Sequence, residues 1–269
     1  MPPHIISPAF RLHQSTRDST PTSTLSERGL PEPVRRAART TRVLIIDDDV
    51  DATARLRGVL QEEGFRVDAD TQAPHPFARR AFDGYSLIIV DVMSERVKGL
   101  DGLGHIRANS ALPVLVLTAL GDEAHLIAGL DIGADDYVVK PCRPREVVAR
   151  VRALLRRTRV SAALRGVAEV LSSGGLTMWP GQRRAEWRGE PLKLTSTEFN
   201  LLEVLLREVG RPVSKTDLSI RALGRAPVRY ERSIDVHLCS VRRKLGVRPD
   251  GRPRIQAVYL HGYQLLKEW

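Results

Sequence analysis

Four short apolar runs in the first half of the chain each end on a polar side chain that could take part in chemistry. In chain order, these side chains are those of Asp47 and Asp48, Asp91, Thr118 and Lys140. A buried strand does not end on a carboxylate for packing reasons, because an ionised carboxylate is costly to desolvate. Asp91 alone could equally cap a helix that follows it, since Asp is a common helix N-cap. The other three runs favour a shared site.

The combination of side chains indicates phosphoryl chemistry. Carboxylates that lie together repel one another unless a metal ion or a lysine lies among them. Oxygen ligands at a half-open site suit Mg²⁺, which keeps several waters and recruits phosphate oxygens. A lysine and a hydroxyl nearby suit an incoming phosphoryl group. The set therefore predicts a site at which an Asp receives a phosphoryl group.

This site requires the side chains to lie at one edge of a single sheet. The apolar runs have the composition of strands buried on both faces, and they cover residues 43–46, 87–90, 114–117 and 137–139. A further short strand is expected at residues 65–67, and helical apolar stripes lie at 52–60, 126–130 and 147–155. Strands that alternate with helices predict an α/β fold with a five-stranded, doubly wound parallel sheet. The carboxyl ends of parallel strands share one edge.

These motifs, in this order and spacing, resemble the receiver domain of bacterial two-component response regulators. The resemblance implies that Asp91 is the phosphoacceptor and that a sensor histidine kinase phosphorylates it. It also implies a Mg²⁺ site made by Asp47, Asp48, Asp91 and the backbone carbonyl of Met93. In the same family, Thr118 and Lys140 would contact the phosphoryl oxygens, and Tyr137 would be a switch that turns inward as Thr118 moves.

Two surfaces of this domain bear on its partners. The loop after the phosphoacceptor departs from the family at Ser94, Glu95 and Lys98, which leaves the choice of kinase open. Another surface alternates in charge, a pattern that is also typical of an ordinary solvated helix face. In the subfamily that this surface resembles, active receivers dimerise, so we expect a homodimer on phosphorylation. Its residues are Leu126, Asp135, Asp136, Glu146, Arg150, Arg152 and Arg157.

Length and charge predict two domains with different partners. A chain of 269 residues is long for one domain. Residues 43–159 carry 16 Lys and Arg against 18 Asp and Glu, whereas residues 160–269 carry 19 against 11. The basic second half is therefore expected to meet a polyanion. We expect a disordered basic tail at 1–41, the receiver at 42–157, a linker at 158–174 and a second domain at 175–269.

The sequence favours a cytoplasmic protein. It has neither a signal-peptide core nor an apolar run of about 18 residues. Cys142 and Cys239 lie in different expected domains without metal-ligand spacing, which is typical of reduced thiols. The N-terminal tail could add weak DNA affinity or be dispensable, and the sequence does not separate these alternatives.

The stretch from Arg232 to Leu245 has the pattern of a DNA-reading helix. Its apolar residues recur at helical spacing and should be buried; they are Ile234, Leu238, Val241 and Leu245. The opposite faces carry basic and small side chains, which suit a major groove. A solvated basic helix shows the same pattern. Upstream, Thr195–Glu198 matches a capping box that opens another helix.

Several segments of this second half resemble the OmpR/PhoB-type winged-helix domain, with details nearest to its CpxR branch. They are Leu194–Phe199, Ser233–His237, Arg242–Leu245 and Gly262–Tyr263. The resemblance places Arg232, His237, Cys239 and Arg242 near phosphates, and Ser233, Val236 and Ser240 near bases. Arg243 is expected on the same DNA-binding surface. In the wing, Tyr259–His261 replaces the usual Arg-Gly pair, and Arg254 could substitute for the lost Arg.

Three functions compete at this point. A phosphorylation-gated transcription regulator that binds promoter DNA explains every motif, with RNA polymerase as a further candidate partner. A DNA-binding protein without phosphorylation would keep the winged helix and lose the phosphoacceptor site, yet all its side chains are present. An aspartyl phosphatase would need a second carboxylate two residues after its nucleophile, where this chain has Met93. We therefore predict the first function and no enzymatic activity.

Overall fold

The computed structural model describes residues 41–71, 82–95, 97–119, 123–163, 169–227 and 232–267. The predicted N-terminal tail lies outside these ranges, apart from its last residue. Within these ranges, no helix combines the length and the apolar composition that crossing a bilayer requires.

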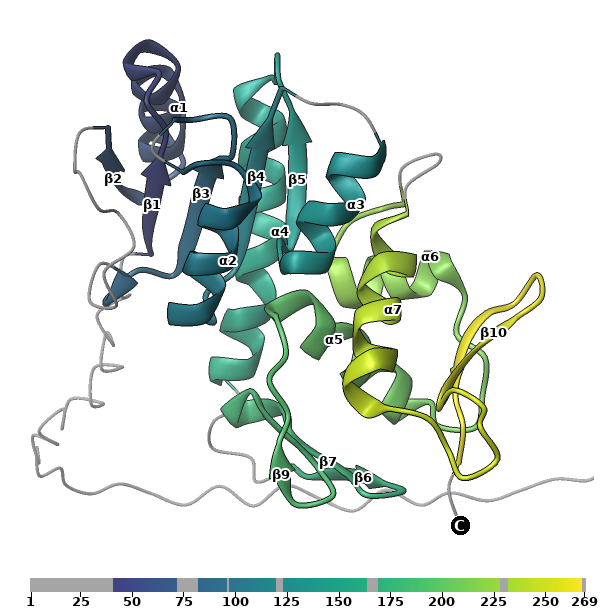
Figure 1. Cartoon of the computed structure of the whole chain (residues 1–269). Helices are drawn as coiled ribbons and strands as arrows, with labels where there is room; N and C mark the ends of the chain where they lie inside the picture. The colour runs from purple at the N-terminus through teal and green to yellow at the C-terminus, as the bar shows by residue number, and fades with distance from the viewer. Residues whose placement is uncertain are drawn as a thin grey trace, which may run out of the picture. The chain divides into compact units, whose positions relative to one another are not determined.

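From Arg42 to Ala163, five strands form one sheet, and helices connect or follow most of them (Figure 1). They are β1 (Arg42–Ile46), α1 (Val50–Glu62), β2 (Arg66–Asp70), β3 (Leu87–Asp91), α2 (Leu100–Asn109), β4 (Val114–Thr118), α3 (Glu123–Ile132), β5 (Asp136–Val139) and α4 (Pro144–Ala163). The five strands lie in the order β2-β1-β3-β4-β5, and every neighbouring pair is parallel. The predicted doubly wound parallel sheet is confirmed.

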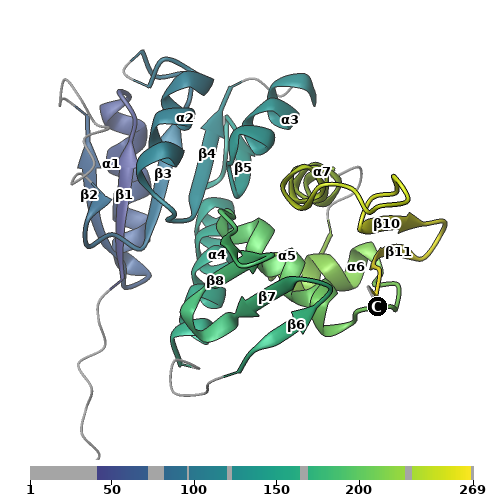
Figure 2. The ribbon, with the colours of Figure 1, turned by 60° about the horizontal axis from the view of Figure 1, so that its bottom comes forward.

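The central strand β3 shows why its residues are apolar up to Asp91. Successive side chains of a strand point to opposite faces of the sheet. Leu87 and Ile89 pack in the core under α1 and α4, whereas Ile88 and Val90 pack in the core under α2 and α3. Helices cover both faces (Figure 2). The strand therefore presents its first polar side chain only at the carboxyl edge of the sheet.

The second half forms a separate core between small sheets and helices. Its elements are β6 (Leu171–Ser173), β7 (Leu176–Trp179), η3 (Pro180–Gln182), β8 (Arg184–Trp187), β9 (Glu190–Pro191), α5 (Ser196–Arg207), α6 (Lys215–Leu218), η4 (Ser219–Leu223), α7 (Ser233–Leu245), β10 (Ile255–Val258) and β11 (Gly262–Leu265). Strands β6 to β9 form an antiparallel sheet, and β10 and β11 form a hairpin, the wing. Helices α5 and α7 pack between them around Leu202 and Leu238.

Two local expectations can be compared with these bounds. The capping box is confirmed, because the Thr195 side chain accepts from the Glu198 backbone while Glu198 bonds back to the Thr195 N–H. The expected linker at 158–174 is shorter than we predicted. Helix α4 continues to Ala163, since no Gly or Pro interrupts the chain before Gly166, and β6 already begins at Leu171.

Candidate phosphoacceptor site and DNA interface

The carboxyl ends of β1, β3 and β5 bring Asp47, Asp91 and Lys140 together. The Lys140 Nζ lies 2.6 Å from Asp91 Oδ2 and 2.9 Å from Asp47 Oδ2. Both carboxylates are buried, with residue exposures of 5% for Asp91 and 2% for Asp47. The two carboxylates thus share one ammonium group, and the contact between Lys140 and Asp47 joins residues that lie 93 positions apart in the chain.

The charges of this cluster balance locally. Burial alone would lower the pKa of Lys140, but its hydrogen bonds to Asp91 and Asp47 outweigh burial and raise that pKa. Lys140 therefore stays protonated and offsets the repulsion between the two carboxylates. Backbone N–H groups hold the other oxygens: Met93 donates to Asp91 (2.7 Å), Asp49 to Asp47 (2.9 Å) and Glu95 to Asp48 (3.1 Å).

The donor chemistry at this edge fits Mg²⁺, because carboxylate and carbonyl oxygens are the ligands that this ion prefers. The exposed carboxylate of Asp48 lies beside the buried pair, next to the backbone of Glu95. In this arrangement the Lys140 ammonium group lies against both buried carboxylates. In the part of the chain that the structure describes, no group of three or more Asp, Glu, His or Cys side chains is placed to hold a metal ion.

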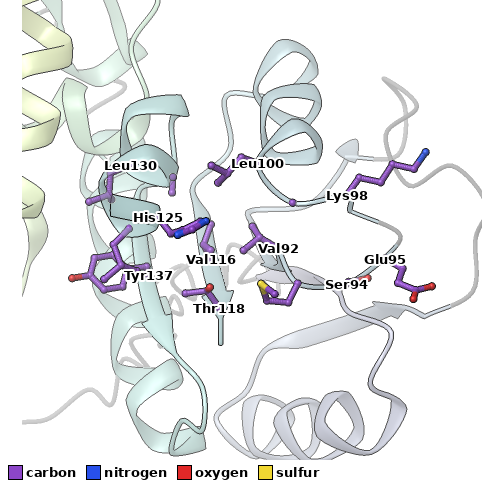
Figure 3. Close-up of a pocket in the computed structure, with 15 residues that line it drawn as sticks. Val92, Ser94, Glu95, Lys98, Leu100, Val116, Thr118, His125, Leu130 and Tyr137 are labelled. Atoms are coloured by element: carbon purple, nitrogen blue, oxygen red, sulfur yellow. The ribbon is translucent and has the colours of Figure 1, made fainter. Parts of the chain in front are cut away.

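Thr118 and Tyr137 lie on neighbouring strands beside a cavity of about 410 Å³ (Figure 3). Apolar side chains form most of its wall, among them Val92, Leu100, Val116 and Leu130. Thr118 is buried at the end of β4, and its carbonyl accepts from the Lys140 N–H at 2.7 Å. Tyr137 is half-buried, and its hydroxyl points away from Thr118.

Helix α7 buries the apolar stripe that its sequence predicts. Ile234, Leu238, Val241 and Leu245 all belong to the core of the second domain. Arg242 Nε donates to the Ile255 carbonyl in the wing at 2.7 Å. Cys239 is exposed.

The opposite face of α7 is covered, contrary to our expectation that it is exposed. Ser233, Val236, His237 and Ser240 are all buried. Val236 packs in the receiver core cluster with Leu130 of α3 and with Ala134. The physical reason is that α3 carries apolar side chains on more than one side, and the small residues of α7 allow close approach.

We call the contact of α7 and its neighbours in the second domain with the receiver the closed junction. Polar contacts reinforce it. The Thr197 N–H donates to Asp135 Oδ1 at 2.7 Å, and Arg225 Nη2 lies 3.2 Å from Asp136 Oδ1. Two cations of the predicted DNA surface are also engaged: Arg232 pairs with Glu123 at 2.7 Å, and Arg243 pairs with Asp131. Of the side chains expected to contact DNA, Arg232, Val236 and Arg243 are thus held by the receiver.

His237 is the most enclosed of these side chains. It is fully buried, and within the described residues neither ring nitrogen makes a well-formed hydrogen bond. Burial lowers its pKa, although the charges of Asp135, Glu198 and Asp136 act in the opposite direction. A neutral imidazole therefore lies in the junction, rather than a cation facing phosphates.

The surface predicted to dimerise is largely used within the chain. Asp135 and Asp136 are buried in the contacts above, and Arg150 bonds both Asp136 oxygens at 2.9 Å. Glu146 pairs with Arg150 at 3.1 Å, and Arg152 pairs with Glu63. Leu126 lies half-buried at the wall of the receiver cavity. The side chain of Arg157 lies outside the described part of the structure.

We had suggested that Arg254 could replace the cation that the wing lacks, but the structure contradicts this suggestion. Arg254 is 3% exposed, its Nε and Nη2 donate to the carbonyls of Leu245 and Val247, and its guanidinium stacks on Trp187. It fastens the end of α7 to the first sheet. The sequence carries no signal for this role, because an Arg of a basic domain that contacts DNA and one that is buried between two elements are indistinguishable in sequence.

Other residues that shape the site were missed. Arg107 pairs with the buried Asp135 and also donates to the carbonyls of Gly133 and Leu112. Asp49 caps α1 and accepts from the Ala52 N–H at 2.8 Å. The N-cap could have been found from the capping preference of Asp, whereas the partner of Arg107 is set by tertiary packing.

Two family models match the chain. The model described as response regulator receiver domain matches residues 43–152. The model described as transcriptional regulatory protein, C terminal, matches residues 189–265.

Relatives match across both domains. The transcriptional regulatory protein CpxR of Klebsiella pneumoniae subsp. pneumoniae is 37% identical over 228 residues, which cover 84% of this chain and 98% of that protein. CpxR of Escherichia coli (strain K12) is 36% identical with the same coverage. Among solved structures, a mutant of RitR has a TM-score of 0.64 and 19% identity, and the match covers 85% of this chain and 100% of that one. At that identity the likeness shows the fold alone.

Proposed function

The chain belongs to the response regulators that join a receiver to an OmpR/PhoB-type DNA-binding domain, a family of phosphorylation-dependent transcription regulators. From this premise, we propose that Asp91 is its phosphoacceptor and that phosphorylation uncovers α7 for promoter DNA. The observation that carries the proposal is the contact of Lys140 with both Asp91 and Asp47 at the carboxyl edge of the sheet. The family to which the chain belongs consists of transcription regulators, so we set aside the alternative that the protein is an aspartyl phosphatase.

The phosphoryl group comes from a phosphohistidine of a sensor kinase. A carboxylate oxygen of Asp91 attacks the phosphorus, the P–N bond breaks, and the imidazole of the kinase leaves with the bonding electrons. Lys140 then contacts a phosphoryl oxygen, with the Thr118 hydroxyl on the neighbouring strand. A Mg²⁺ ion held by Asp47, Asp48, Asp91 and the Met93 carbonyl would supply positive charge against the phosphoryl oxygens.

Tyr137 links this event to the rest of the receiver. Its ring borders the cavity of about 410 Å³ whose wall also includes Thr118. When Thr118 moves toward the phosphoryl group, the ring can turn into this space, because the wall there is apolar. The inward ring changes the surface formed by β5 and α3.

That surface cannot serve the closed junction and a dimer at once. Asp135 and Asp136 bind Thr197 and Arg225 of the second domain in this structure. A two-fold homodimer would need the same carboxylates to face a second copy. We propose that phosphorylation exchanges the internal partners for those of the second copy and frees α7.

Two remaining aspects follow from the same premise. The receiver implies a histidine kinase partner and the winged helix implies DNA. We propose a cytoplasmic location, since promoter DNA lies there in bacteria. RNA polymerase is a candidate contact once the regulator is bound at a promoter.

Phosphorylation in solution tests the proposal. Wild-type protein and the variants Asp91→Asn and Asp101→Asn are incubated with acetyl phosphate and Mg²⁺, then analysed by intact mass and by binding to selected DNA. Asp101 lies exposed on α2 and serves as the matched control. We expect one phosphoryl group and tighter DNA binding in all but Asp91→Asn. Phosphorylation of Asp91→Asn to the same extent as wild-type protein would refute the proposal. A DNA affinity of wild-type protein that is the same before and after phosphorylation would also refute it.

A further inference from the structure

The tip of the wing exposes two large apolar side chains. Tyr259 and Leu260 lie between β10 and β11, and each is 86% exposed. The turn is closed by the His261 N–H, which donates to the Val258 carbonyl at 3.0 Å. Large apolar side chains that lie exposed side by side are a feature of interaction sites.

The backbone of the tip is also unusual. Leu260 has a φ of 59°, in the left-handed region that favours glycine. Two residues later, Gly262 lies at a φ of 107°, and a Cβ there would meet the Val213 carbonyl oxygen at 2.1 Å. The chain therefore uses glycine where the hairpin touches its own domain, but keeps a leucine at the open tip. A leucine held in this conformation points to a function for its side chain.

The stem of the wing is fastened to the DNA-reading helix. The Tyr263 hydroxyl donates to Asp235 Oδ1 on α7 at 2.7 Å, and Arg242 of α7 donates to the Ile255 carbonyl. Tyr263 also pairs with Val213 through backbone hydrogen bonds. The tip and α7 therefore move as one piece, and whatever α7 binds also places the tip.

The charge of the wing selects the occupant. No Asp or Glu lies between Gly251 and Lys267, and the exposed cations of the segment are Arg252 and that lysine, since Arg254 is buried against Trp187. None of the four facing pairs of the stem carries a charge, and its polar pair is Gln256 with Gln264. An apolar tip on a stem without negative charge suits a phosphate-lined groove that continues the surface bound by α7.

We propose that Tyr259 and Leu260 enter the minor groove beside the α7 site and wedge between two base pairs. The proposal rests on the proposed binding of promoter DNA by α7. Apolar side chains inserted in this way unstack the base step and kink the duplex toward the major groove. Pyrimidine–purine steps unstack most readily, so we infer that such a step lies under the tip in the preferred operator.

The test uses the full-length chain after phosphorylation with acetyl phosphate and Mg²⁺. The probe is a duplex recovered with wild-type protein from a randomised pool. Binding is measured by fluorescence anisotropy, bending by energy transfer between labelled ends, and unstacking by permanganate reactivity of thymines. The variants are Tyr259→Ala, Leu260→Gly and, as the matched control, Val170→Ala, which truncates an exposed apolar side chain beside β6.

We expect wild-type protein and Val170→Ala to bend the duplex and to expose a reactive thymine. Tyr259→Ala and Leu260→Gly should bind about tenfold more weakly and lose both signals. Leu260→Gly should melt no lower than wild-type protein, because glycine suits the turn, so a folding defect would not explain its loss.

Three results would overturn the proposal. Wild-type protein could bind without bending or unstacking the duplex, or the wing variants could match wild-type protein in all three measurements. A loss confined to cooperative filling of adjacent sites would instead assign the tip to a second protein copy. Failure of all variants, including wild-type protein, to bind any DNA would refute the proposed function itself.

Discussion

Replacing Arg225 by alanine should release the DNA-reading helix without phosphorylation. Arg225 belongs to the second domain, and its Nη2 lies 3.2 Å from Asp136 Oδ1 of the receiver. Both side chains are largely shielded, with exposures of 14% and 5%. Arg150 bonds both oxygens of Asp136, so the carboxylate keeps a partner in the variant. The substitution therefore weakens the closed junction more than it weakens the receiver.

The size of the effect follows from this geometry. A hydrogen bond between charged groups contributes about 1.5–3 kcal/mol when it is shielded from water. Because about 1.4 kcal/mol corresponds to a factor of ten, the equilibrium should move about ten- to a hundredfold toward the open form. Apparent affinity scales with the fraction of competent protein. Unphosphorylated Arg225→Ala should thus bind DNA more tightly by this factor, up to the affinity of the fully open protein.

Fluorescence anisotropy with the selected duplex, before and after acetyl phosphate, measures the prediction. The control is Arg221→Ala, which removes a more exposed pair with Glu208 inside the second domain. We expect a gain only for unphosphorylated Arg225→Ala, and little change once the protein is phosphorylated. A parallel gain in both states would show that Arg225 acts on the DNA complex. An unchanged unphosphorylated affinity would refute the closed junction as the barrier.

Three further outcomes are expected. Lys140→Ala removes the cation shared by Asp47 and Asp91, so added Mg²⁺ should raise its melting temperature more than that of wild-type protein; calorimetry against KCl of matched ionic strength measures this, and equal shifts would argue against the shared site. Burial lowers the pKa of His237 below 6.5, so the unfolded chain binds the extra proton and stability falls as the pH drops below about 6.5. Urea titrations at neutral and mildly acidic pH should show a larger loss in wild-type protein than in His237→Phe, and identical losses would contradict it. Thr195→Ala should cost about 1 kcal/mol through the lost cap, and an unchanged urea midpoint would exclude that contribution.

The receiver fold could be predicted because its signals are local. The three inner strands of the sheet, β1, β3 and β4, are short apolar runs, and burial on both faces requires nothing more than such a run. The polar residue at the end of each run identifies the edge at which chemistry lies. The structure brings Asp91 and Lys140 together at this edge, since parallel strands leave little freedom for where their carboxyl ends meet.

The packing of the receiver against α7 could not be predicted in the same way. Val236 and Ser240 suit a major groove, but small and apolar side chains suit a neighbouring helix equally well. Their partner, α3, lies about a hundred residues away in the chain, and no periodicity links the two segments. The prediction for Arg254 was wrong for a related reason, because its stacking on Trp187 depends on how the first sheet of the second domain packs against the end of α7.

Strand β5 explains how a phosphoryl group can act on a junction at its other end. Asp136 begins this strand and holds Arg225, Tyr137 follows it, and Lys140 comes directly after the last strand residue. A ligand shifts an equilibrium only by its differential interaction with the two states. Lys140 is bonded to Asp91 in the closed form, so under the proposed function a phosphoryl group on Asp91 would alter that contact and move the end of β5. Because a strand is a stiff element paired along its length with β4, displacement at Lys140 also reaches Tyr137 and Asp136. Under the proposed function, the closed junction would therefore be coupled to the proposed phosphoacceptor through one short segment, and weakening either end should loosen the other.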